Sequence, residues 1–163
     1  MKRLFSCLFF SFMLLSCTPK YGIQKAQSFV RESVAGTVQT NNNGRPIESG
    51  VSKTHLIYVE TVKGAMAPEW NIAWVDGKPY TIRAAEVQPG TVIGTTKDHK
   101  DMQVHAKSEN QLWQLVLFPP PSGFADSTLK NNSAPIVLTG KWNGKDFRYA
   151  INKEQELEMQ MGQ

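Results

Sequence analysis

The segment 135–152 constrains the fold more than any other part of the chain, because it joins two alternating runs through the pair Asn143-Gly144. Asn-Gly strongly favours a two-residue type I′ turn, in which both central residues need a positive φ. Such a turn pairs Trp142 with Lys145 and puts alternate residues of both runs on one face. Apart from Lys145, that face carries only apolar residues and glycine: Ile136, Leu138, Gly140, Trp142, Phe147, Tyr149 and Ile151. The segment therefore predicts an antiparallel hairpin with one buried face.

The rest of the chain follows the same pattern of short apolar or alternating runs separated by Gly, Pro and Asn. The predicted strands cover residues 29–39, 54–62, 69–75, 78–87, 91–96, 102–107, 111–118, 135–142 and 145–152. The tail, 156–161, alternates with period two and predicts either an edge strand or a short helix. We expect an all-β fold, namely an antiparallel β-sandwich of about 8–9 strands, with a small β-barrel as the alternative.

A second hairpin is predicted around Asp76-Gly77, where the sequence allows two registers. A two-residue turn pairs Trp74 with Pro79. A three-residue loop starting at Val75 shifts the pairing by one residue, which moves the side chains of the second strand to the opposite face. The three-residue loop groups all the large apolar side chains on one face: Trp70, Ile72, Trp74, Tyr80 and Ile82. We expect this second register because it separates apolar from polar residues.

Most aromatic residues alternate with aliphatic ones, which indicates a place in the core. Trp70 differs from the others, since it lies two residues after Pro68 at the start of a strand, and in the two-residue register it faces Arg83. Exposed aromatic side chains are frequent at binding surfaces. Trp70 and Arg83 are therefore the candidate binding surface.

The N-terminus has the layout of a secretory signal peptide: Lys2 and Arg3 precede an apolar run from Leu4 to Leu15. As a helix this run would span about 18 Å, well short of the roughly 30 Å of bilayer hydrocarbon. A permanent transmembrane anchor is therefore the weaker interpretation.

The run ends in Leu14-Leu15-Ser16-Cys17, which resembles the lipobox of bacterial lipoproteins. The resemblance implies cleavage before Cys17 and attachment of a diacylglyceryl group to its thiol. Residues 1–16 are then the lipoprotein signal peptide, 17–27 the lipidated cysteine with a polar tether, and 28–163 a single β-rich domain.

The resemblance places the protein in the bacterial cell envelope, attached to the membrane through the lipid, with the outer membrane favoured in a Gram-negative cell. Cys7 and Cys17 are the two cysteines of the chain, so the domain itself would hold no disulfide, thiolate metal site or cysteine nucleophile. The net charge falls from +4 to +2 without Lys2 and Arg3. The remaining charges are interspersed rather than gathered in a basic stripe, which argues against nucleic acid as a partner.

Sequence motifs give little support to catalysis or to a cofactor. His99 and His105, in KDHKDMQVH, are weak metal candidates, because zinc sites use three or four placed ligands. No nucleophile elbow, phosphate loop or zinc-protease motif occurs, so we expect a protein that is not an enzyme and has no cofactor.

The expected function is that of a lipid-anchored binding or accessory module for an unidentified envelope protein or glycan. The alternative is a barrel-like carrier of a small apolar ligand, with the strand 111–118 lining its cavity. An envelope hydrolase is less favoured, since its paired carboxylates would have to come from different strands.

Overall fold

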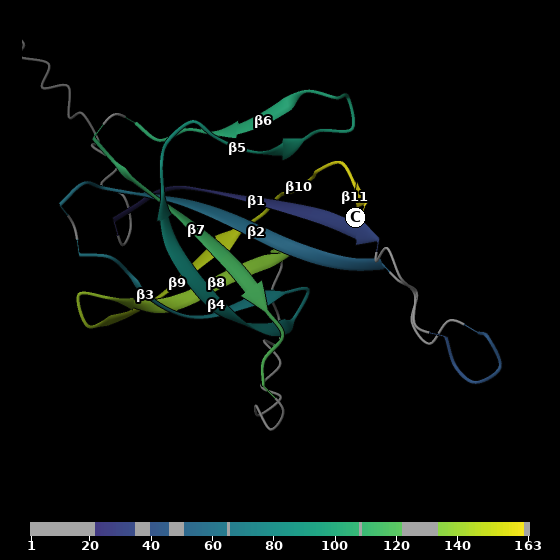
Figure 1. Cartoon of the computed structure of the whole chain (residues 1–163). Helices are drawn as coiled ribbons and strands as arrows, with labels where there is room; N and C mark the ends of the chain where they lie inside the picture. The colour runs from purple at the N-terminus through teal and green to yellow at the C-terminus, as the bar shows by residue number, and fades with distance from the viewer. Residues whose placement is uncertain are drawn as a thin grey trace, which may run out of the picture.

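The computed structural model describes residues 22–34, 40–45, 51–64, 66–107, 109–121 and 134–161, and these confirm the all-β class (Figure 1). The strands are β1 (Ile23–Val34), β2 (Val51–Thr61), β3 (Glu69–Val75), β4 (Lys78–Val87), β5 (Thr91–Thr95), β6 (Asp101–Val104), β7 (Gln111–Phe118), β8 (Ile136–Trp142), β9 (Lys145–Ile151), β10 (Glu154–Glu156) and β11 (Gln160–Met161). No helix in this part of the chain is long and apolar enough to cross a membrane.

A large sheet contains all strands except β5 and β6, in the order β10-β1-β2-β7-β4-β3-β8-β9, with β11 also paired to β1. Its pairs are antiparallel apart from β10 and β11, which run parallel to β1. The sheet curls into a half-barrel (Figure 1). Its two end strands are consecutive in the chain, because β9 leads into β10 through Asn152 and Lys153. This mixed curled sheet, with a small second sheet, fits both the predicted sandwich and the alternative barrel.

The concave face of the large sheet holds the main core. Its buried members are Ile23, Ile57, Val59, Ala73, Val75, Leu115, Leu117, Ile136, Leu138, Phe147 and Ile151. These side chains come from strands far apart in the sequence, and half-buried aromatic residues such as Trp113 and Trp142 pack around them. Burial of this apolar surface is the main term that stabilises the curled sheet.

The hairpin β5–β6 forms a second layer outside β1 and β2 (Figure 1). A second apolar cluster lies beneath it, comprising Phe29, Tyr58, Ile93, Val104, Leu112 and Leu157. Because successive residues of a strand face opposite sides, β2 contributes Ile57 to the main core and Tyr58 to this outer cluster. The outer layer thus covers only one end of the convex face.

The hairpin β8–β9 has the predicted register, from Trp142 paired with Lys145 to Ile136 paired with Ile151. Asn143 and Gly144 have φ angles of 49° and 73°, as a type I′ turn requires. The apolar face of this hairpin packs into the main core.

The predicted register of the hairpin β3–β4 is wrong. Asp76 and Gly77 form a two-residue turn with φ angles of 48° and 78°, and Trp74 pairs with Pro79. The reason is a bulge in β3: its pairing with β8 shifts between Trp70 and Ala73. The bulge reverses the parity within the strand, so Trp70 and Ala73 both reach the main core.

Trp74 and Ile72 therefore face the convex side, where a small third cluster buries Trp74 with Ala134 and Val137. Val137 lies on the face of β8 opposite the one that the sequence predicts to be buried, so both faces of this strand are buried at that point.

The domain begins earlier than residue 28, because β1 starts at Ile23, whose side chain is buried. The segment 17–27, predicted to be a tether, therefore contributes Ile23–Gln27 to the sheet. Cys17 and the preceding signal-like segment lie outside the described residues.

Candidate functional site

The C-terminal segment, Glu154–Met161, lies along β1 and connects the two sheets. Between β10 and β11 it leaves the β1 ladder, since Val30 pairs with Glu156 but Ser33 pairs with Gln160. In this interval the backbone of Leu157 donates to Val30, and that of Glu158 donates to Thr95 on β5, at 2.9 and 2.7 Å. The segment thus ties the outer hairpin to the edge of the large sheet.

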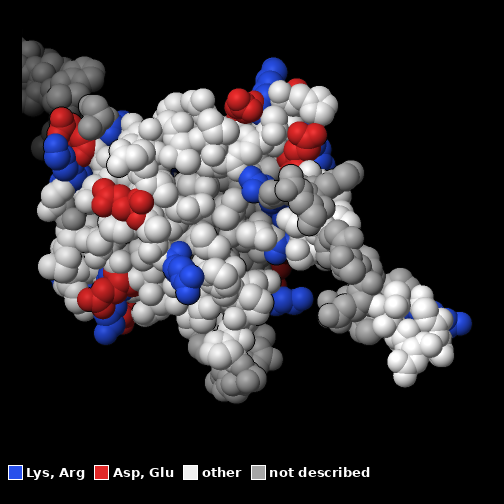
Figure 2. Space-filling model, in the orientation of Figure 1, with Lys and Arg blue, Asp and Glu red and all other residues white. Residues whose placement is uncertain are grey.

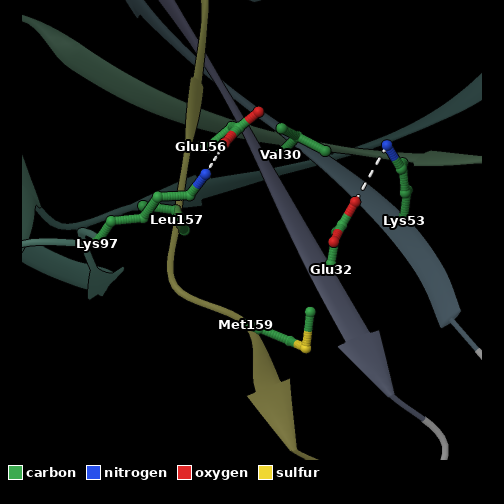
Figure 3. A pocket seen from close by; sticks show the side chains of 7 residues that line it. All are labelled: Val30, Glu32, Lys53, Lys97, Glu156, Leu157 and Met159. Carbon is green, nitrogen blue, oxygen red and sulfur yellow. Dashed lines mark hydrogen bonds and ion pairs between the residues drawn. The ribbon is translucent and has the colours of Figure 1, made fainter.

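The detour of the C-terminal segment leaves a cleft of about 310 Å³, which we call the edge cleft (Figure 3). It is lined by Val30, Glu32, Lys53, Lys97, Glu156, Leu157 and Met159. The floor is apolar, and Met159 points from the C-terminal segment toward β1 (Figure 3). The Met159 side chain is exposed, and methionine adapts readily to irregular apolar partners.

Two ion pairs flank the edge cleft (Figure 3). On one side Nζ of Lys53 lies 3.1 Å from Oε1 of Glu32, and on the other Lys97 pairs with Glu156. The Glu156 carboxylate raises the pKa of Lys97, and Lys97 lowers the pKa of Glu156. All four side chains are exposed, so salt screens these pairs and each contributes little to stability.

A partly buried polar group lies next to the edge cleft on the concave side. Oε1 of Glu154 accepts a hydrogen bond from Oγ of Ser28 at 2.8 Å and lies 3.0 Å from Nδ1 of His55. His55 pairs across the ladder with Val30, which lines the edge cleft. The group joins β10 to β1 and β2 through these side-chain contacts.

The structure separates Trp70 and Arg83, which the sequence suggested as one binding surface. Trp70 packs on the concave side with its ring centroid 5.7 Å from that of Phe147. Its Nε1 is the one buried side-chain nitrogen or oxygen among the described residues that lacks a hydrogen bond. Arg83 is exposed on the convex side, 5.4 Å from the ring centroid of Phe118. Figure 2 shows few charged residues on the face that β4 and β7 present in this view.

The two weak metal candidates are both exposed, in and beside the hairpin β5–β6. Nδ1 of His99 lies 3.3 Å from Oε1 of Glu158, whereas His105 follows β6. Within the described ranges, no group of three or more His, Cys, Asp or Glu side chains is placed to hold a metal ion.

Sequence reasoning missed the edge cleft because its residues come from four segments: β1, β2, the β5–β6 turn and the C-terminal segment. Each charged residue, taken alone, is typical of an exposed loop or strand. No local motif could have indicated that they meet.

Comparison with known proteins adds no family: no family model matches the chain, and no curated protein or solved structure matches it.

Proposed function

We propose that this protein is a lipid-anchored binding module of the bacterial cell envelope, which recognises a segment of a partner protein at the edge cleft. The lipobox-like sequence ending at Cys17 supports the anchor. The observation that carries the binding role is the edge cleft itself, where an apolar floor lies between two exposed ion pairs.

The chemistry of the edge cleft favours a partner segment with an apolar side chain flanked by charges of both signs. Val30, Leu157 and Met159 provide the apolar contact. Exposed ion pairs contribute at most about 1 kcal/mol each, so a partner's charged groups can replace the internal ones at low cost. Complementary charges then select the partner and its orientation.

The concave face supports a binding module better than a carrier, because its apolar side chains pack against one another as the main core. An apolar ligand inside the half-barrel would have to displace them. Close packing of this kind makes such displacement costly.

Photo-crosslinking in the native host tests the proposal. A benzophenone amino acid replaces Met159 in one full-length variant and Met66 in a control, since both side chains are exposed. We expect a discrete crosslinked protein in the membrane fraction from position 159 and none from position 66. The charge-swapped variant Lys97→Glu with Glu156→Lys retains an ion pair but reverses its direction, and it should lose the crosslink. Equal crosslinking from both positions, or an unaffected swapped variant, would refute a specific site.

A further inference from the structure

A second cavity lies at the seam of the half-barrel, where β9 turns into β10 beside β1. This seam cavity has a volume of about 320 Å³ and is lined by residues 25–28 on one side and by residues 149–153 with Gln155 on the other. β10 pairs with β1 only from Ser28 onward, and β9 pairs only with β8 among the described strands. The cavity is therefore bordered by two strand edges that do not pair with each other.

The seam cavity differs from the edge cleft in its charge. Its lining contains Lys25 and Lys153 but no carboxylate, whereas both lysines of the edge cleft are matched by a glutamate. Neither Lys25 nor Lys153 belongs to an ion pair among the described residues. Both lysine side chains are exposed, so salt screens their charges, and together they favour an anionic ligand at this part of the surface.

The uncharged part of the lining is rich in hydrogen-bonding groups. Gln27, Asn152 and Gln155 carry carboxamides, each of which offers two N–H donors and one acceptor. Tyr149, which is half-buried and packs against the main core, adds a phenol hydroxyl. Burial raises the pKa of Tyr149, so the hydroxyl stays protonated and can donate.

We propose that the seam cavity binds an anionic saccharide unit, with its acidic group between Lys25 and Lys153 and its hydroxyls on the carboxamides. The volume lies at the lower end of the range typical of ligand sites, about 300–1,000 Å³, which suits one sugar residue rather than a long polymer segment. An acidic peptide would also satisfy the lysines, and its backbone amides can pair with the carboxamides, so tetraglutamate is the probe that separates a peptide site from a saccharide site. This inference is independent of the anchor and of the edge cleft.

Titration of ¹⁵N-labelled full-length protein in detergent micelles, followed by NMR, tests the proposal. The probes are a trimer of galacturonic acid, a neutral galactose trimer, inorganic phosphate and tetraglutamate. We expect the acidic trimer to bind and to shift the amide signals of Gln27, Tyr149 and Lys153. Added salt should weaken its binding.

Paired variants identify the source of the affinity. Lys25→Gln with Lys153→Gln should weaken binding of the acidic trimer by about tenfold or more, as expected for the loss of charge-assisted hydrogen bonds. Lys78→Gln with Lys100→Gln removes the same charge from exposed positions outside the cavity and should change the affinity less than about twofold.

Four results would overturn the assignment. The first is the absence of any shift up to about 10 mM probe, a level at which even weak sites are occupied. The second is binding of the neutral trimer with equal affinity. The third is binding of phosphate or tetraglutamate as tightly as the acidic trimer, which would leave a site for charge or peptide but not for a saccharide. The fourth is equal loss of affinity in both variants.

Discussion

Replacement of Leu157 by alanine should loosen the outer hairpin from the large sheet. The Leu157 side chain is 4% exposed and packs in the outer cluster with Phe29 and Ile93. Buried Leu-to-Ala substitutions cost about 2–5 kcal/mol, and the cost rises with the cavity that remains. The outer cluster is small and lies under a two-stranded sheet that can settle inward. We therefore expect a loss near the middle of this range, about 3 kcal/mol in the free energy of unfolding.

Urea unfolding measures this loss, and amide hydrogen exchange shows where it falls. In Leu157→Ala the amides of β5 and β6 should exchange faster than those of β8 and β9, because the backbone bonds from the C-terminal segment remain but the apolar contact is lost. Met159→Ala is the matched control, since its side chain is exposed, and it should change stability by less than about 0.5 kcal/mol. A loss below about 1 kcal/mol for Leu157→Ala, against the 2–5 kcal/mol expected for such a site, would refute the reasoning.

Two further predictions concern the large sheet and the alkaline limit of stability. Gly140→Ala should reduce the free energy of unfolding by more than about 2 kcal/mol. The added Cβ would overlap the carbonyl oxygen of Glu69 and lie 2.8 Å from the Phe147 ring. An unchanged melting temperature would disprove this close approach. Burial raises the pKa of Tyr58, so the folded state holds this proton more tightly. The stability that protonated Tyr58 contributes is fully present below about pH 10 and is lost as the pH rises through the pKa of Tyr58 in the folded state. Tyr58→Phe should flatten this alkaline decline in unfolding titrations, and an identical decline in the variant would contradict the assignment.

The part of the fold that could be predicted is the part that local chemistry specifies. In β8–β9 the turn at Asn143-Gly144 and the alternation of both strands require the same register, and the structure has it. Because turn and pattern agree, the register of such a segment can be predicted without knowledge of its surroundings. The strand β7 likewise has the bounds that the apolar run ending before Pro119 predicts.

The part that could not be predicted depends on contacts between distant segments. The bulge in β3 follows from packing on β8 and Phe147, which the alternation within residues 69–75 does not reveal. The same holds for both cavities: the edge cleft needs the C-terminal segment to lie on β1, and the seam cavity needs β9 to approach β1. Neither approach has a signal in a single stretch of sequence.

Metabolic labelling with radioactive palmitate tests the central claim, attachment to the membrane through Cys17, most directly. Cells that produce the full-length protein should incorporate the label into it and retain it in the membrane fraction. Cys17→Ser should remove the label and prevent cleavage before residue 17. An unlabelled wild-type protein recovered in the soluble fraction, with no change on substitution of Cys17, would contradict the account.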